Sequence, residues 1–254
     1  MAVIAVFNQK GGVGKTTTAL NVGAALARRQ IDTVSIDLDP QGHLTLACTG
    51  TQMAGANGIY AFFSDGVPLD RVTHRTACGR RLVPASLDLS KVDALCGGNA
   101  GISTRLRDGI REQLGAGNAP VIIDCCPMLG VLTLNALIAA DRVLIPVSAD
   151  FLSLQGVDRL DRALGALETK LGRRIERRVL VTRYDGRRRL SGEIYGDLKR
   201  RYGETVCNTR ISENVALAES PMRGKDIFAF APSSPGARDY DAAVQELGSG
   251  GFFN

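Results

Sequence analysis

The chain has 254 residues and a formal net charge of +5, and its 44% hydrophobic and 22% charged residues exclude an intrinsically disordered protein. No apolar run reaches about 18 residues and the start MAVIAVFNQ is not a secretory signal, so we expect a cytoplasmic protein without membrane contact. The six cysteines form no C-x-x-C pair and only two histidines accompany them, which argues against a structural zinc site.

Short apolar runs alternate with helical patterns along the chain. Residues 2–7, 33–36, 120–124, 143–147 and 178–181 are predicted to be buried strands. Helices are predicted at 16–29, 132–140, 153–170, 191–202 and 236–247, and loops at 50–58 and 78–81. Apolar strands separated by helices predict an α/β fold with a doubly wound, mostly parallel sheet covered on both faces. We expect one domain over 1–254, with 248–254 (GSGGFFN) as a frayed tail.

The first predicted strand runs directly into FNQKGGVGKTTT, at residues 7–18, which resembles a phosphate-binding loop. In such a loop, backbone N–H groups and the start of a helix point at one place, and glycines let the backbone close around phosphate. Lys15 is expected to bridge the β- and γ-phosphates of a nucleotide, and the Thr16 hydroxyl to ligate Mg²⁺. Two features depart from the common G-x-x-x-x-G-K-[ST] form: Gln9 replaces the first glycine, and Lys10 adds a second cation. The predicted nucleotide-binding residues here are Lys10, Gly11, Gly12, Val13, Gly14, Lys15, Thr16 and Thr17.

Carboxylates follow two other predicted strands. The sequence DLDPQG, at 37–42, comes after the second strand, and Asp124 ends the apolar run VIID. In phosphoryl transfer, one Asp typically steadies Mg²⁺ and another polar group orients the attacking water. Asp124, at the end of a buried strand, suits the metal role. Asp39 is expected to face the γ-phosphate.

These motifs together resemble the ParA/MinD family of deviant Walker-type P-loop ATPases, and its ParA branch most closely. The matching segments are NQKGGVGKTTT, DLDPQG, IIDCCPMLGVLTLNALIAAD, RYDGRRRLS and ENVALAESPMRGK, so the resemblance runs from residue 3 to about 247. Because the sequence shows one predicted strand before the loop, we expect the family's small type, which has no N-terminal helix-turn-helix. The resemblance implies a P-loop NTPase that hydrolyses ATP to ADP and phosphate with Mg²⁺.

The resemblance also implies roles for single residues. Lys10 stands at the family's signature lysine, which crosses a nucleotide-sandwiched dimer interface to the phosphates of the other subunit, much as an arginine finger does. Asp39 corresponds to the residue associated with activating water, so the implied catalytic residues are Asp39, Lys10 and Lys15. Asp37 and Asp124 correspond to the switch and Mg²⁺-associated carboxylates, so the implied metal residues are Thr16, Asp37 and Asp124. Ser212 and Asn214 fall where the family contacts adenine, with serine replacing the usual proline.

Basic residues are concentrated late in the chain. Between residues 170 and 225 there are 15 Lys and Arg against 7 Asp and Glu. The excess forms either an ordinary solvated face or a surface for a polyanion. The family's arginines are missing from the segment at 212–217, where this chain has Glu213 and Ala216. The predicted DNA-binding residues are therefore Arg187, Arg188, Arg189, Lys199, Arg200, Arg201 and Arg223, with both clusters expected on one side of the molecule.

The sequence thus predicts a Mg²⁺-dependent ATPase whose ATP-bound homodimer binds nonspecific DNA over the nucleoid. An adaptor protein is expected to stimulate hydrolysis, and the favoured task is plasmid or chromosome partition. Two alternatives remain: positioning of a protein cargo such as a carboxysome or chemoreceptor cluster, and a nucleotide-gated scaffold that does not bind DNA. His43 either touches the switch or is a solvated loop residue, while Cys125 and Cys126 are expected to pack near the end of the sheet.

Overall fold

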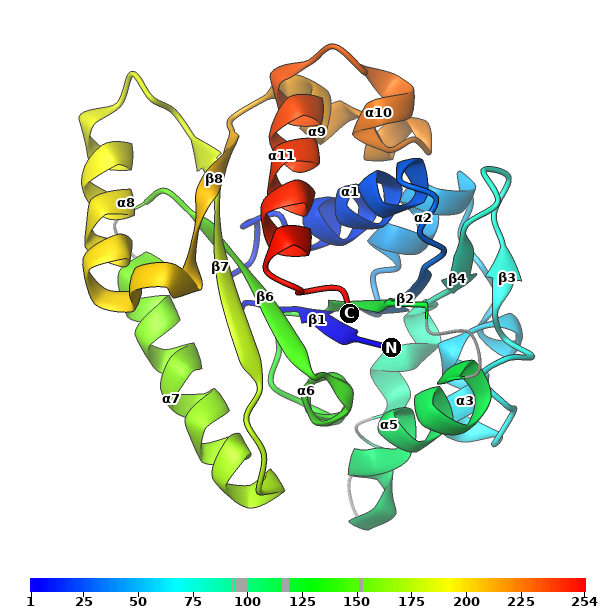
Figure 1. Cartoon of the computed structure of the whole chain (residues 1–254). Coiled ribbons are helices and arrows are strands. Elements are labelled where there is room, and N and C mark those ends of the chain that lie inside the picture. Colours follow the sequence, from blue (N-terminus) through cyan, green and yellow to red (C-terminus); the bar gives the residue numbers. More distant parts are fainter. Residues whose placement is uncertain (93, 95–99, 116–118, 151–152) are drawn as a thin grey trace.

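A computed structural model describes residues 1–92, 94, 100–115, 119–150 and 153–254. These residues form an eight-stranded sheet with the order β3-β4-β2-β5-β1-β6-β7-β8 (Figure 1). Every pairing is parallel except that of β3 with β4. The strands are β1 (Val3–Val6), β2 (Val34–Leu38), β3 (His74–Arg75), β4 (Arg81–Val83), β5 (Val121–Cys125), β6 (Arg142–Ser148), β7 (Glu176–Tyr184) and β8 (Val206–Ser212).

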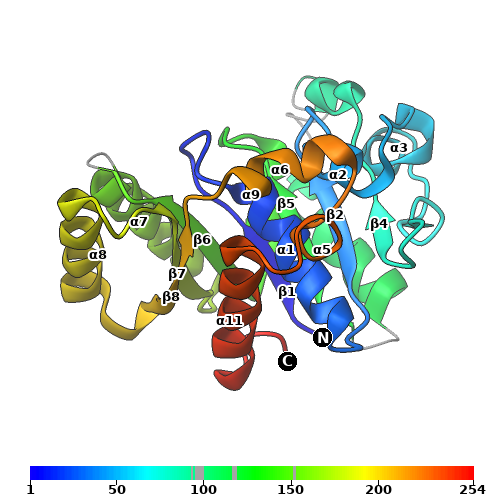
Figure 2. The same cartoon turned by 90° about the horizontal axis from the view of Figure 1, so that it is seen from above.

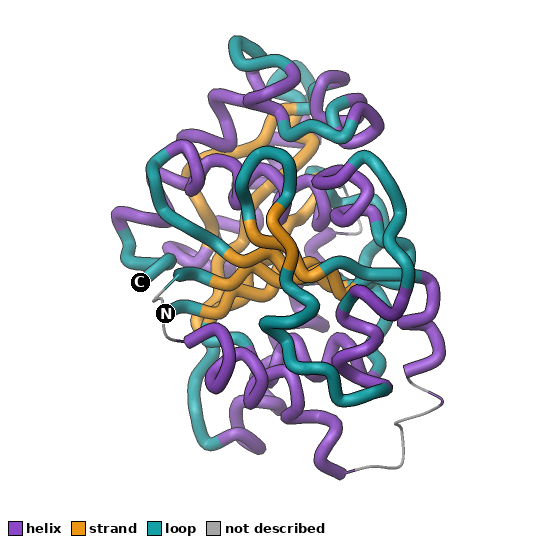
Figure 3. The backbone as a smooth tube through the Cα atoms, turned by 90° about the vertical axis from the view of Figure 1, so that its right-hand side faces the viewer, coloured by secondary structure: helices purple, strands orange, loops and turns teal. Residues whose placement is uncertain are grey.

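Helices cover both faces of this sheet, as the views from above and from the side make plain (Figures 2 and 3). One layer holds α3 (Ile59–Ser64), α5 (Arg105–Gly109), α6 (Val131–Ala139), α7 (Ser153–Leu171) and α8 (Arg189–Tyr202). The other holds α1 (Lys15–Arg28), α2 (His43–Thr49), α9 (Val215–Glu219), α10 (Ile227–Phe230) and α11 (Pro235–Ser249). Successive side chains of a strand point to opposite faces, so Val3 and Ala5 pack in the first layer and Ile4 and Val6 in the second. The predicted doubly wound sheet is confirmed.

The described part of the chain contains no helix long and apolar enough to cross a bilayer. The longest helix, α7, has 19 residues and carries charged side chains along its length.

The C-terminal tail differs from the expectation. Residues 248–254 were predicted to fray, but Phe252 and Phe253 are buried, with 1% and 7% of their surface exposed. The Arg142 guanidinium, on β6, lies 5.8 Å from the centre of the Phe252 ring and donates to the carbonyl of Phe252 at 3.2 Å. It also donates to the Asn254 carbonyl at 2.7 Å. The tail prediction was wrong because two aromatic rings and a distant arginine outweigh the flexibility of the glycines.

The sheet brings the predicted motifs to one edge. Asp37 on β2 lies beside Asp124 on β5, and Asp124 in turn lies beside Val6, the last residue of β1 before the phosphate loop. In open parallel sheets, ligands bind at the carboxyl ends of the strands, where the connections diverge to opposite faces. The functional site is therefore sought at this edge.

Candidate active site

The phosphate loop has the backbone of an anion cradle. Gly12 and Gly14 have φ of 73° and 86°, a left-handed conformation that residues with a Cβ adopt only with strain. Gly14 is the N-cap of α1, and its carbonyl accepts from the Thr18 amide at 2.8 Å. The first turn of this 14-residue helix carries no acidic residue. Its amides and its positive dipole end are thus available to phosphate.

Lys15 folds back over the loop that carries it. Its ammonium is largely buried, with 8% of the residue exposed, and donates to the Lys10 carbonyl at 2.9 Å. Burial lowers the pKa of Lys15, while the nearby carboxylates of Asp124 and Asp39 act in the opposite direction. A partly desolvated cation at this point is suited to pairing with phosphate oxygens.

Asp124 is a buried carboxylate without a partner. It is fully buried at the end of β5, and neither of its oxygens has a hydrogen bond among the described residues. Burial raises the pKa of Asp124 well above its usual range, the neighbouring Asp37 raises it further, and the Thr16 hydroxyl lies close enough to lower it. Two unsatisfied oxygens beside a hydroxyl are a donor set that suits a hard divalent cation. Thr16 and Asp124 therefore fit Mg²⁺.

Asp37 has a different environment. One oxygen accepts from the amide and the hydroxyl of Thr45 at 2.8 and 2.7 Å, and the other accepts from the Asp39 amide at 3.1 Å. Burial, only partly offset by these hydrogen bonds, raises the pKa of Asp37 to about 6. The Thr45 hydroxyl also accepts from the Ala85 amide at 2.8 Å. Asp37 thus fastens α2 to the sheet, and its metal role stays a prediction.

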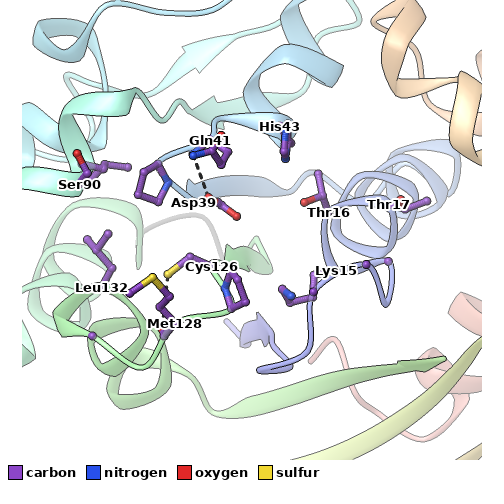
Figure 4. Close-up of a pocket in the computed structure, with 17 residues that line it drawn as sticks. Lys15, Thr16, Thr17, Asp39, Gln41, His43, Ser90, Cys126, Met128 and Leu132 are labelled. Carbon is purple, nitrogen blue, oxygen red and sulfur yellow. Dashed lines mark hydrogen bonds between the residues drawn. The ribbon is translucent and has the colours of Figure 1, made fainter. Parts of the chain in front are cut away.

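A cavity of about 740 Å³ opens in front of the loop (Figure 4). Asp39 and Lys15 line it from opposite walls, and Asp39 accepts from the Gln41 amide at 2.9 Å. His43 is an exposed residue of the same lining. The loop contributes Gly11, Gly12, Gly14, Lys15, Thr16 and Thr17, and the segment after β5 contributes Cys126, Pro127, Met128 and Gly130. Asp39 is therefore in a position to act on water at the outer end of a bound phosphate chain.

The two cysteines lie where the sequence predicted, at the end of β5. Cys125 is fully buried, and burial raises the pKa of its thiol well above the usual range. Cys126 lines the large cavity, with its Sγ 3.4 Å from the Thr133 hydroxyl.

A second cavity of about 440 Å³ lies on the other side of the same loop. Ser212 and Asn214, predicted at the adenine end, both line it, and the Asn214 side chain caps α9 by accepting from the Ala216 amide at 2.8 Å. The sequence did not predict three other lining residues: Thr182, Arg183 and Tyr240. The Thr182 hydroxyl donates to the Val13 carbonyl at 2.8 Å, which ties the end of β7 to the phosphate loop. The two cavities together offer space for a nucleotide on both sides of the cradle.

Lys10 makes an ion pair within its own chain. Its ammonium lies 2.5 and 2.6 Å from the two carboxylate oxygens of Asp150. Asp150 also accepts from the hydroxyls of Ser148 at 2.6 Å and Ser153 at 3.0 Å. Partial burial raises the pKa of Asp150, but the hydrogen bonds from Lys10 and the two serines outweigh it and hold that pKa below its usual range. The Lys10 side chain is 35% exposed, so it is accessible at the edge of the loop.

The predicted DNA-binding residues lie at the two ends of α8. The 187–189 arginine cluster follows β7 at the carboxyl edge of the sheet, and 199–201 ends the helix near the start of β8, at the opposite edge. Arg189 and Arg200 are eleven residues apart in sequence, which spans roughly 17 Å of helix. The two clusters thus lie at opposite ends of one helix, and the expectation that they share one side of the molecule stays a prediction. Arg223 is exposed on the short turn Pro221–Arg223, beyond α9.

These basic side chains already have partners. Arg187 contacts Asp185 at 2.9 and 3.0 Å, Arg188 contacts Asp185 and Glu213 at 3.3 and 3.5 Å, and Arg189 contacts Glu193 at 2.7 Å. At the other end of α8, Arg200 pairs with Asp197, Arg201 with Asp158, and Lys199 with Asn208. Exposed pairs of this kind contribute only about 0–1 kcal/mol. They can therefore be exchanged for phosphate at low cost.

The fold and this site define a P-loop nucleotide-binding protein: a parallel sheet, a glycine cradle at a helix start, a lysine over it, and a hydroxyl with a buried carboxylate for Mg²⁺.

Comparison with known proteins identifies the family. A model of the AAA domain family matches residues 1–177. The chromosome-partitioning ATPase Soj of Thermus thermophilus is 41% identical over 245 residues, which cover 96% of this chain and 94% of that protein. The chromosome partitioning protein ParA of Caulobacter vibrioides is 36% identical over 252 residues, covering 97% and 94%.

A solved structure agrees with these matches. Cobyrinic acid a,c-diamide synthase from Mycobacterium smegmatis, with bound ATP analog and magnesium, is 30% identical, covers 97% of this chain and 94% of that one, and has a TM-score of 0.80. The chain belongs to the ParA/MinD family of P-loop ATPases. It is an ATPase that uses ATP and Mg²⁺.

Proposed function

We propose that the protein is a partition ATPase that forms an ATP-bound homodimer on DNA. The observation that carries this proposal is Lys10: a second cation beside the phosphate loop, half-buried and paired with the carboxylate of Asp150 at the surface. Lys15 already provides the cation over the cradle. By exchanging its ion pair with Asp150 for phosphate oxygens, Lys10 would bind the nucleotide of a second subunit, so ATP would join the two subunits. The partition relatives in Thermus and Caulobacter support the same task.

In the hydrolysis of ATP, each residue of the candidate active site would have a separate role. Glycine-loop amides and Lys15 bind the phosphate chain, and Lys10 of the partner subunit adds positive charge where charge develops in the transition state. Asp39 orients the attacking water and accepts its proton. Thr16 and Asp124 would hold Mg²⁺, which would supply positive charge beside the phosphates. Ser212 and Asn214 border the cavity proposed for the adenine.

DNA binding would come from exposed arginines at the carboxyl edge. A monomer offers few phosphate contacts, whereas a two-fold dimer doubles them, so affinity would rise steeply on dimerisation. If the dimer engages ~6 phosphates, affinity should fall by roughly 10³-fold or more between about 50 and 200 mM salt. Lys199, Arg200, Arg201 and Arg223 are proposed as additional contacts. The protein would then act in the cytoplasm over the nucleoid, with an adaptor protein stimulating the ATPase to release it.

The test is fluorescence anisotropy with a short duplex of random sequence, without nucleotide, with ADP and with a slowly hydrolysed ATP analogue. The analogue should give tight, salt-sensitive binding. The double reversal Arg187→Glu and Arg189→Glu should abolish binding while light scattering still detects the dimer, since both side chains are more than 90% exposed. The matched control is Arg159→Glu with Arg162→Glu, exposed on α7. A dimer that forms but binds no DNA would exclude partition by DNA binding and favour the scaffold.

A further inference from the structure

Glu213 lies between the smaller cavity and the 187–189 arginine cluster. It lines the 440 Å³ cavity, and its amide donates to the Tyr184 carbonyl at 3.0 Å, so the segment is anchored to the end of β7. Its two carboxylate oxygens face different arginines: one lies 3.3 Å from Arg183, the other 3.5 Å from Arg188. Both arginine side chains are exposed, by 60% and 66%, and Glu213 by 40%.

Arg183 connects this carboxylate to the phosphate loop. It has a φ of 51°, one of two non-glycine residues with positive φ among those described, and such a conformation persists only where surrounding contacts hold it. The preceding residue, Thr182, bonds the Val13 carbonyl in the loop at 2.8 Å. The end of β7 is thus held by the phosphate loop on one side and by Glu213 on the other.

Three carboxylates neutralise the arginines at this edge, and they differ in kind. Asp185 is 9% exposed and binds Arg187 with both oxygens, and these hydrogen bonds lower the pKa of Asp185 to about 2. Glu193 pairs with Arg189 one turn along the same helix. Both belong to the segment that carries the cluster. Glu213 comes from the segment after β8, and of the three it alone borders the nucleotide cavity.

We propose that Glu213 is an internal competitor of DNA phosphate at Arg183 and Arg188, and that a nucleoside entering the smaller cavity draws it away from them. This inference rests on the proposed DNA binding and states how the nucleotide would regulate that binding. Without nucleotide, the carboxylate occupies the two arginines and keeps the cluster nearly neutral. With nucleotide, the arginines become available to phosphate oxygens. Because coupling between two binding events is reciprocal, DNA should also tighten nucleotide binding by the same factor.

The experiment compares Glu213→Gln with Glu219→Gln, an exposed glutamate on α9 outside this network. Duplex DNA of random sequence is titrated at about 50 mM salt, without nucleotide and with a slowly hydrolysed ATP analogue. The nucleotide-free Glu213→Gln protein should bind DNA roughly 2- to 30-fold more tightly than wild type. This is the factor expected if DNA no longer has to break two exposed ion pairs, each worth about 0.2–1 kcal/mol. Its salt dependence should steepen by about 0.9 in log–log slope for each phosphate gained. Glu219→Gln should match wild type.

The outcomes separate this inference from the function on which it rests. If wild type binds DNA with the ATP analogue and Glu213→Gln behaves as Glu219→Gln in both states, the competitor role is overturned and the proposed function stands. If no variant binds DNA in any nucleotide state, the proposed function fails and the inference fails with it. The role would be established if nucleotide-free Glu213→Gln binds DNA more tightly than wild type and its DNA affinity rises less when the ATP analogue is added.

Discussion

The ion pair with Asp150 holds the Lys10 ammonium within its own chain, and Lys10 must leave this pair to contact a nucleotide bound to a second subunit. Asp150→Asn keeps the shape of the side chain but removes the charge that holds the lysine. Its amide oxygen can still accept from one of the two hydroxyls, of Ser148 and Ser153, that donate to Asp150. The two partners are 35% and 44% exposed, so the pair belongs with surface ion pairs worth about 0.2–1 kcal/mol. A two-fold dimer releases two such pairs, so the substitution should tighten the ATP-dependent dimer by roughly 2- to 30-fold.

Sedimentation velocity over a dilution series, with a slowly hydrolysed ATP analogue, measures this dimer constant directly. Lys10→Ala should bind the nucleotide through Lys15 and the loop yet remain monomeric. Adding Asp150→Asn to Lys10→Ala should change nothing, because the pair acts only through the lysine. An Asp150→Asn dimer of unchanged or lower stability would refute the reasoning. So would an increase in dimer stability that Asp150→Asn still produces in the Lys10→Ala background.

Three further predictions concern the cradle and its surroundings. Asp39→Ala should bind ATP and dimerise but release phosphate at least about 10²-fold more slowly, as expected for loss of a general base, whereas Lys15→Ala should lose nucleotide binding. Asp124→Asn should raise the melting temperature of the nucleotide-free protein by at least about 2 °C, since it removes an unpaired buried carboxylate, and it should abolish Mg²⁺-dependent turnover. Gly224→Ala should destabilise more than Gly172→Ala in urea unfolding: both have φ of 62°, but only at Gly224 would the new Cβ meet described backbone, 3.2 Å from the Gly50 Cα.

The strands that the sequence predicted are those buried on both faces. β1, β5 and β6 are continuous apolar runs, and such runs need no knowledge of their neighbours to be recognised. β8, VCNTRIS, was missed because it lies at the sheet edge, where only three of its seven residues are buried and polar residues interrupt the apolar pattern. β3 and β4 have two and three residues, too few for any periodicity.

The residues of the candidate site likewise fall into those that a local sequence pattern predicts and those that it does not. Lys15, Asp39 and Asp124 were identified because a motif fixes each of them relative to a strand end. Asp150 follows β6 as Asp124 ends β5, so the same rule of a carboxylate after a parallel strand could have indicated it. Thr182 and Tyr240 carry no local signal: a polar residue in a strand and an aromatic residue in a helix acquire meaning only through the loop and the cavity beside them.

The phosphate loop lines both cavities, and α2, which lines the larger one through His43, reaches towards the smaller one through its packing. Asp37 and Thr45 fasten the start of this helix to β2 and to the Ala85 amide, directly behind Asp39. At the other end of α2, the missing Cβ of Gly224 lets this residue approach the backbone of Gly50 closely, and Gly224 lies on the segment that continues from α9 to α10. α2 therefore contacts the segment after α9, while residues of α9 itself line the smaller cavity. Because packed elements shift between discrete arrangements instead of deforming gradually, we expect a movement of the Asp39 segment on hydrolysis to displace residues 212–214, the segment that contains Glu213.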